Sequence, residues 1–366
     1  MPDEQRTRLS SLLGSLAASL DITPNQCGIA EEHYNAVAGW FGKDGASTST
    51  YHPDIYPQGS FRLGTVVRPT SEADEYDIDL ICELDLDRTI GQSGLKTIVG
   101  DRLKENGTYE SMLDEGNRCW TLSYPGTVQF HMDVLPAIPD GQEAGAIFVA
   151  DSKLATWQYS NPRGFAEWFK GRMEIRFLEK RAQLAEAVRK SIEEIPEFEV
   201  KTSLQQAIQI MKRHRDIAFQ HDQDNKPISI IITTLAAHAY GNEADLLDAL
   251  ETLVERMPHY IESKNDEFWI ANPVNPNENF AEKWREHPER QEAFMTWLGD
   301  LESGLRSSLR KTEVRSMKES LEPRFGSAVV NKAAAIAFPS LLGVASSQQS
   351  RPKITIVEKP NKPWGQ

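Results

Sequence analysis

The chain is poor in cysteine and has no long apolar run. Its three cysteines, Cys27, Cys82 and Cys119, are widely spaced and form no CxxC pair, which excludes a disulfide-rich scaffold and a zinc ribbon. No stretch approaches the ~20 consecutive apolar residues of a transmembrane helix, and the charged first residues are unlike a secretory signal. We therefore expect a cytoplasmic protein with reduced, mostly buried thiols and no membrane partner.

Basic residues are also in deficit. Lys and Arg number 40 against 54 Asp and Glu, a net charge of -14, which argues against a protein that grips nucleic acid through its phosphates. The excess acid lies in the first half, because residues 1–170 hold 25 acidic and 13 basic side chains whereas residues 171–366 hold 29 and 27. Acid concentrated near a site more often indicates a metal centre than a nucleic-acid surface, so we expect no extended nucleic-acid surface.

A length of 366 residues predicts two domains. We place the first at 1–170, the second at 171–345 and a flexible tail, rich in Ser, Gln, Pro and Lys, at 346–366. Apolar residues at helical spacing predict helices in the ranges 9–20, 29–40, 165–192, 202–220, 228–256 and 284–305. Loop-like composition marks 42–57, 140–163 and 271–280. The second domain is therefore mainly α-helical.

Two segments of the first domain alternate with the period of a strand. Apolar residues from Tyr76 to Leu80 alternate with Asp77 and Asp79, and those from Val128 to Val134 alternate with polar residues that include Asp133. Pro136 and Pro139 are expected to end the second strand. The two strands can pair if residues 82–127 form the connection, which would bring their acidic faces together.

Asp77, Asp79 and Asp133 are the candidate catalytic and metal-binding residues. Two residues apart on one strand, Asp77 and Asp79 point from the same face, and Asp133 would complete a triad. Carboxylates held on rigid strands suit hard ions such as Mg²⁺ or Mn²⁺, which leave room for water and phosphates. An exposed D-x-D pair is common by chance, so the interpretation depends on what surrounds it.

A glycine-serine turn precedes the acidic strand. Gln58, Gly59 and Ser60 could present backbone N–H groups and a hydroxyl to a phosphate. The order of this turn, the D-x-D strand and a later lone Asp matches two-metal nucleotidyl transfer, in which two ions activate a hydroxyl and hold a triphosphate. Lys212 is the candidate cation for the β- and γ-phosphates, with Ser229 as its partner. The alternative is that Lys212 lies on the solvent-exposed face of its helix and has no role in phosphate binding.

These motifs resemble the bacterial cGAS/DncV-like nucleotidyltransferases of the anti-phage systems called CBASS. The resemblance rests on QGSFRLGT (58–65), DEYDIDL (74–80) and FHMDVLPA (130–137), and in the second half on SNPRGFAEWF (160–169), LQQAIQIMKRHRD (204–216) and KPISIIITTLAAHAY (226–240). It implies an α+β fold, with a polymerase-β-like nucleotidyltransferase domain of mixed sheet and helices followed by a helical domain like that of oligoadenylate synthetases. The family's nucleotide-binding and metal positions fall on the residues named above, those of the second domain on Lys212 and Ser229.

The resemblance also implies an activity and partners. It implies template-independent joining of nucleoside triphosphates, ATP before GTP, into a cyclic second messenger that acts on an operon effector. An adenine-containing cyclic trinucleotide is the expected product, with a cyclic dinucleotide as the alternative. A HORMA-domain activator and a ubiquitin-transfer-like partner that conjugates the tail at Gly365 and Gln366 are both compatible with the family, and a tail without a role is equally so.

Two other functions remain open from the residues alone. A transferase acting on RNA or protein would use the same triad, although the charge of -14 and the lack of an aromatic-basic stripe argue against a long RNA substrate. A catalytically silent nucleotide sensor is the second, which the intact triad disfavours. His131 shares the polar face of Asp133, where a metal or base role is conceivable; we prefer a hydrogen-bonded structural role.

Overall fold

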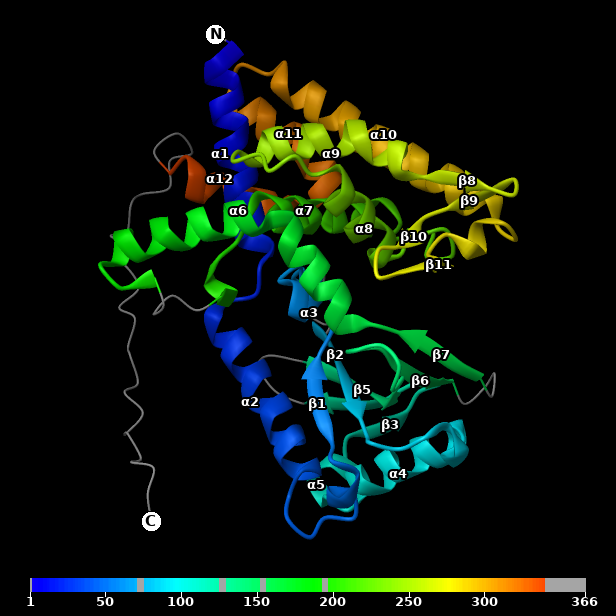
Figure 1. Ribbon diagram of the computed structural model, residues 1–366. Helices are drawn as coiled ribbons and strands as arrows, with labels where there is room; N and C mark the ends of the chain where they lie inside the picture. Colours follow the sequence, from blue (N-terminus) through cyan, green and yellow to red (C-terminus); the bar gives the residue numbers. More distant parts are fainter. Residues whose placement is uncertain (1, 71–75, 125–129, 152–155, 193–196, 340–366) are drawn as a thin grey trace.

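A computed structural model describes residues 2–70, 76–124, 130–151, 156–192 and 197–339 (Figure 1). It consists of a mixed β-sheet with flanking helices and a larger helical part, and the short helix α3 lies between them. The predicted α+β fold class is confirmed. The predicted tail at 346–366 and the start of the second predicted strand, residues 128 and 129, lie outside the described residues.

The sheet has seven strands in the order β1-β2-β5-β4-β3, with β6 joined to β5 and β7 to β6. The strands are β1 (Asp54–Pro57), β2 (Tyr76–Glu83), β3 (Leu113–Glu115), β4 (Trp120–Tyr124), β5 (Phe130–Pro139), β6 (Ile147–Asp151) and β7 (Thr156–Ser160). The pair β2 and β5 is parallel, and the other described pairs in this sheet are antiparallel. A parallel pair needs a long crossover, and the segment between these two strands supplies it, as expected.

The crossover and the second helix of the chain cover the sheet. The helices of this part are α2 (Pro24–Phe41), α3 (Gly59–Leu63), α4 (Gln92–Lys104) and α5 (Gly107–Glu110). Ile78 and Leu80 of β2 are buried in one apolar cluster with Met132 and Val134 of β5 and with side chains of α2 and α4. Burial of this alternating apolar set fixes the register of both strands, because a one-residue slip would turn it outward.

The helical part has one core that includes the first helix of the chain. Its helices are α1 (Pro2–Leu20), α6 (Pro162–Val188), α7 (Ser203–Ala218), α8 (Ser229–Ala239), α9 (Leu246–Arg256), α10 (Pro288–Leu309), α11 (Val314–Phe325) and α12 (Ser327–Ala337). The leucines of α1 are buried against this set, although the sequence places α1 with the first domain. The helix α6 crosses the predicted boundary at residue 170, and that boundary stays a prediction.

Short elements complete the described chain. They are the strands β8 (Glu262–Lys264), β9 (Glu267–Trp269), β10 (Ala271–Asn272) and β11 (Asn275–Asn279), and the 3-10 helices η1 (Ser49–Tyr51), η2 (Arg88–Ile90), η4 (Glu197–Glu199), η5 (Met257–Tyr260) and η6 (Glu282–Trp284). Within the described ranges no helix is long and apolar enough to cross a membrane. The three cysteines are free, Cys27 and Cys82 buried and Cys119 half-buried.

The three expected loops all contain regular structure. The range 140–163 contains β6, β7 and the start of α6, the range 42–57 contains η1 and β1, and the range 271–280 contains β10 and β11. The strand β5 ends at Pro139, as expected, but it continues through Pro136. Pro136 lies between the last pair with β4 at Val134 and the first pair with β6 at Ala137, so neither antiparallel neighbour needs its missing N–H. The single helix expected over 228–256 is divided into α8 and α9, because Asn242 has a φ of 64° and Asp245 caps a new helix.

Candidate active site

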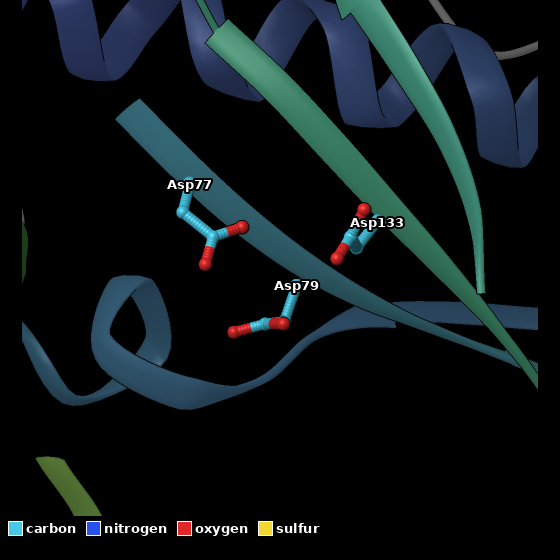
Figure 2. A group of neighbouring side chains, drawn as sticks. All are labelled: Asp77, Asp79 and Asp133. Atoms are coloured by element: carbon cyan, nitrogen blue, oxygen red, sulfur yellow. The ribbon is translucent and has the colours of Figure 1, made fainter. Parts of the chain in front are cut away.

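Three carboxylates converge where β2 and β5 run side by side. Asp79 lies opposite Asp133 in the parallel register, and Asp77 precedes Asp79 by two residues on the same face. Figure 2 shows the three side chains gathered on one side of the two strands. One oxygen atom from each carboxylate lies within 4.8 Å of the others. The structure thus brings together the three residues that the sequence singles out.

The electrostatics of this cluster favour a cation. Burial, followed by repulsion from Asp77 and Asp133, raises the pKa of Asp79 to about 7. His131 and Lys212 act in the opposite direction but do not cancel this rise. Three hard oxygen donors in close contact, one of them unfavourable to ionise without a counter-charge, fit the ligand preference of Mg²⁺ or Mn²⁺.

Neighbouring side chains orient two of the carboxylates. The Thr121 hydroxyl on β4 donates to Oδ1 of Asp133 at 2.5 Å, and these residues are direct partners in the β4–β5 register. His131 Nε2 lies 3.4 Å from Oδ1 of Asp77 on the adjacent strand. Close to Thr121, burial and then the charge of Asp133 raise the pKa of the Cys119 thiol to about 11. Cys119 is therefore a neutral thiol at physiological pH.

The glycine-serine turn lies directly against Asp79. The Gln58 N–H donates to the Asp79 carbonyl oxygen at 2.9 Å, so β1 and α3 are joined to β2 at this residue. Gly59 begins α3 with a φ of 60°, a conformation that favours glycine. A Cβ atom at this position would lie 2.5 Å from Oδ2 of Asp79, and hence only glycine fits. Ser60 is half-buried and follows in the first turn of α3.

Lys212 reaches the same region from the helical part. It is 5% exposed in the middle of α7, and its Nζ donates to the carbonyl oxygen of Thr65 at 3.1 Å and to its hydroxyl at 3.2 Å. Burial and the nearby Arg215 lower the pKa of Lys212 to about 7, although Asp216 and Asp79 oppose this. The solvated helix face considered for Lys212 is wrong, because this side chain is buried between α7 and the segment that follows α3.

Ser229 lies at the first position of α8 and is connected to α7. Its Oγ accepts from Nη1 of Arg215 at 2.8 Å, one helical turn beyond Lys212. Arg215 also donates to Asp216 at 2.8 Å, and Lys226 forms an ion pair with the same carboxylate at 2.9 Å. Lys212 and Arg215 both lie on α7, so Ser229 is joined to the helix that carries Lys212, and Lys212 contacts the segment after α3.

Sequence reasoning missed Thr121, Thr65 and Arg215. Thr121 belongs to a segment with alternating burial, but only the β4–β5 register reveals that it opposes Asp133. Thr65 and Arg215 lie within segments that carry the family resemblance, but only the long-range contacts of the fold reveal what each of them binds. His131 does contact Asp77, while its role as a structural residue stays a prediction.

A family model and a protein relative both match this chain. Residues 8–172 match the model of the Second Messenger Oligonucleotide or Dinucleotide Synthetase domain. Over 307 residues the chain is 31% identical to a c-di-GMP synthase of Roseivirga ehrenbergii. The aligned region covers 81% of this chain and 78% of that protein.

Solved structures share the fold. The CD-NTase CdnG of Bradyrhizobium diazoefficiens, in complex with GTP, superposes with a TM-score of 0.72 at 24% identity, covering 90% of this chain and 98% of that one. The CdnC component of the E. coli MS115-1 complex with HORMA-deltaN has a TM-score of 0.65 at 15% identity, covering 87% of this chain and 96% of that one.

Proposed function

Because the chain belongs to the CD-NTases, the bacterial cGAS/DncV-like nucleotidyltransferases, we propose that its carboxylate site joins two nucleoside triphosphates into a cyclic dinucleotide. Membership makes the protein a nucleotidyltransferase that synthesises a cyclic nucleotide product. The observation that carries the site assignment is the convergence of Asp77, Asp79 and Asp133 beside the glycine-serine turn.

The chain's own groups suggest how the substrates are held. In each step a ribose hydroxyl oxygen bonds to the α-phosphorus of a second nucleotide, the bond to pyrophosphate breaks, and a second such step within the linked product closes the ring. The backbone and hydroxyl of Gly59 and Ser60, with Gln58, bind the triphosphate, while Lys212 and Ser229 approach it from the helical part. Thr121 keeps the Asp133 carboxylate oriented by occupying its Oδ1.

The carboxylates would hold divalent ions, two in this proposal. Such ions supply positive charge that stabilises the triphosphate and lowers the pKa of the attacking hydroxyl. Asp79 lies beside Asp77 on its own strand and opposite Asp133 on the next, so all three carboxylates could supply ligands to such ions. The proximity of Asp79 to Gly59 places the ion site next to the turn proposed for phosphate binding.

Two observations bear on the bases and the ring size of the product, and they disagree. The sequence resemblance favours an adenine-containing cyclic trinucleotide, whereas the relative from Roseivirga ehrenbergii is named for a cyclic dinucleotide with two guanines. We take the dinucleotide with at least one guanine as the proposal. It would act as a second messenger on an operon effector in anti-phage defence, and a HORMA-domain protein is the activator that the CdnC complex suggests.

Product analysis tests this assignment. Purified protein is incubated with all four radiolabelled nucleoside triphosphates and Mg²⁺ or Mn²⁺, treated with phosphatase, and analysed by mass spectrometry. A cyclic dinucleotide that is absent with Asp77→Asn and Asp79→Asn supports the proposal. A trinucleotide refutes the ring size, and a product without guanine refutes the base assignment.

The same assay separates the other two functions. Label incorporated into added RNA or protein, with no cyclic product, would identify a transferase acting on macromolecules. Nucleotide binding without any product, also in the presence of the operon neighbours, would identify a silent sensor.

A further inference from the structure

One face of α7 holds the backbone of the segment that leads from the glycine-serine turn to the acidic strand. Leu63 is the last residue of α3 and residues 64–69 lie in no helix or strand, so the carbonyl groups of segment 63–69 have no partners in a helix or sheet. Leu63, Thr65 and Val66 are buried, and a buried carbonyl without a partner is costly. These carbonyl groups are satisfied by side chains from α7 and from the residue that precedes its cap.

Each of five side chains donates to one carbonyl oxygen in or beside this segment. Lys201 donates to the Gly64 carbonyl oxygen at 2.9 Å, Gln205 to Leu63 at 3.0 Å, Gln209 to Val66 at 2.7 Å, Lys212 to Thr65 at 3.1 Å, and Arg213 to Arg68 at 2.6 Å. We call these five side chains the carbonyl ladder. Gln205, Gln209 and Lys212 are spaced four and three residues apart, which aligns them on a single face of the helix.

Glycine at position 64 permits this approach. Gly64 ends α3 with a φ of 65°, and a Cβ atom there would lie 2.6 Å from Nε2 of Gln205. Gly59, at the other end of α3, is equally close to Asp79. The short helix is thus confined between the carboxylate site on one side and the carbonyl ladder on the other, in agreement with its position in Figure 1.

Both glutamine amides make a second hydrogen bond besides the one to the segment. Gln205 accepts from the Thr202 N–H at 2.9 Å through Oε1, which caps α7, and donates to Leu63 through Nε2. Gln209 is completely buried, and its Nε2 also donates to Asp21 at 2.9 Å. Gln205 is thus held through both Oε1 and Nε2, whereas Gln209 is held through the two bonds of its Nε2 alone, and its buried Oε1 has no partner among the described residues.

From this geometry we infer that Gln205 and Gln209 are positioning residues: they hold segment 63–69, and through it they place the turn at Gly59 and Ser60 for triphosphate binding. The inference rests on the proposed function, because it assigns the turn to phosphate. Neither glutamine needs to touch the substrate. Their loss would weaken nucleotide binding by letting the turn move relative to the carboxylates, while the carboxylates themselves remain in place on β2 and β5.

Matched substitutions on α7 test the role. Gln209→Met keeps the side-chain size and removes the donor. Gln205→Glu keeps the oxygen that caps α7 and removes the donor to Leu63. Gln206→Met is the control, because Gln206 lies on the same helix, is partly exposed and is outside the carbonyl ladder. Circular dichroism and thermal unfolding first establish that each variant is folded, and if one is not, the other carries the test.

Three readouts then apply to the full-length protein. Amide hydrogen exchange over residues 63–69 should be faster in both ladder variants. The dissociation constants of GTP and ATP should rise about tenfold, because a turn that is in the binding position for only about a tenth of the time lowers the apparent affinity by that factor. The KM for the nucleotide that is used should rise to a similar extent, while kcat changes by less than about threefold. Gln206→Met should match the wild type in all three.

The outcomes separate the inference from the proposed function. Unchanged nucleotide affinity in folded ladder variants would overturn the inference, as would a loss of kcat and thermal stability at constant KM, which is the sign of a merely structural role. Failure of the wild type to bind either nucleotide would overturn the proposed function, and the inference with it. Faster exchange together with unchanged affinity overturns the inference alone.

Discussion

Gly59 leaves the space that Oδ2 of Asp79 occupies, since a Cβ atom on the glycine would lie 2.5 Å from that oxygen. The contact joins the start of α3 to the middle of β2, two elements that belong to different sequence motifs. It makes the glycine of the turn a requirement of the carboxylate site, in addition to any contact that its backbone makes with phosphate.

Gly59→Ala should therefore disturb the carboxylate that it faces. Its methyl group would displace Asp79, and the positive φ adds about 1–2 kcal/mol of strain. We expect synthesis of the cyclic product to fall about 100-fold, as misplacement of a catalytic group by 1 Å can cause. Gly14→Ala on α1, where nothing lies within 4 Å, is the control and should stabilise the fold by about 0.5–1 kcal/mol. Equal activity of the two variants would contradict the contact.

The carboxylate cluster should lower stability when no divalent ion is present. The pKa of Asp79 is about 7 in the folded protein, above its ordinary value. Such a group favours the fold fully below pH ~4, and this contribution is lost as the pH rises through 7. At pH 8 without divalent ions, Asp79→Asn should raise the free energy of unfolding by about 2 kcal/mol, and the gain should shrink towards pH 4. Urea titrations at both pH values measure this.

Added Mg²⁺ should make the wild type more stable than Asp79→Asn, which reverses their order of stability without divalent ions. Ions that bind only the folded state raise its stability, so the melting temperature of the wild type should increase with MgCl₂ and that of Asp79→Asn should change little. Asp114→Asn, an exposed carboxylate on β3, provides the control and should behave like the wild type. A wild type whose melting temperature is insensitive to both Mg²⁺ and Mn²⁺ would argue against the ion site.

Thr121 should act through Asp133. Removing its hydroxyl in Thr121→Val frees the carboxylate to rotate, and groups that orient a metal ligand typically contribute 10–100-fold to metal affinity or activity, so we expect a loss of about that size. The Mg²⁺ concentration for half-maximal activity should rise, whereas the KM for nucleotide at saturating Mg²⁺ should change little. Thr121→Ser retains the donor and should restore most of the activity. If valine and serine behave alike, the hydrogen bond has no such role.

Lys212 should make nucleotide affinity dependent on pH. Burial lowers its pKa to about 7, so the positive charge available to a phosphate decreases as the pH rises above 7. Bound triphosphate favours the charged form and moves the transition upward. We expect the dissociation constant of GTP to increase between pH 7 and 9, a change that Lys212→Met should flatten while weakening binding about tenfold at pH 7. Fluorescence titration across this range is the measurement.

The local sequence pattern was sufficient for the carboxylate site. Alternation of Ile78 and Leu80 with Asp77 and Asp79 can satisfy burial in only one way, with the acids away from the core, and the same holds around Asp133. Short strands were harder to predict. The five residues of β7 are only partly buried, and their pattern differs little from that of a loop.

The carbonyl ladder shows what local pattern does not reveal. Gln205, Gln209 and Lys212 at helical spacing look like the solvated side of an amphipathic helix, and in this chain they are buried. Their partners are backbone carbonyls, which carry no residue identity, about 140 positions earlier in the chain. No residue-by-residue pattern encodes such a contact.

The sequence by itself thus determined the family, the fold class, and the side of each strand on which the carboxylates lie, because each depends on short-range periodicity and on motifs. Only the tertiary structure decided that Asp79 faces Asp133, that Gly59 must be a glycine, and that α7 supports the turn. These features depend on which distant segments pack together in the fold. Buried polar groups in those segments must form hydrogen bonds, and their partners come from residues far away in the sequence.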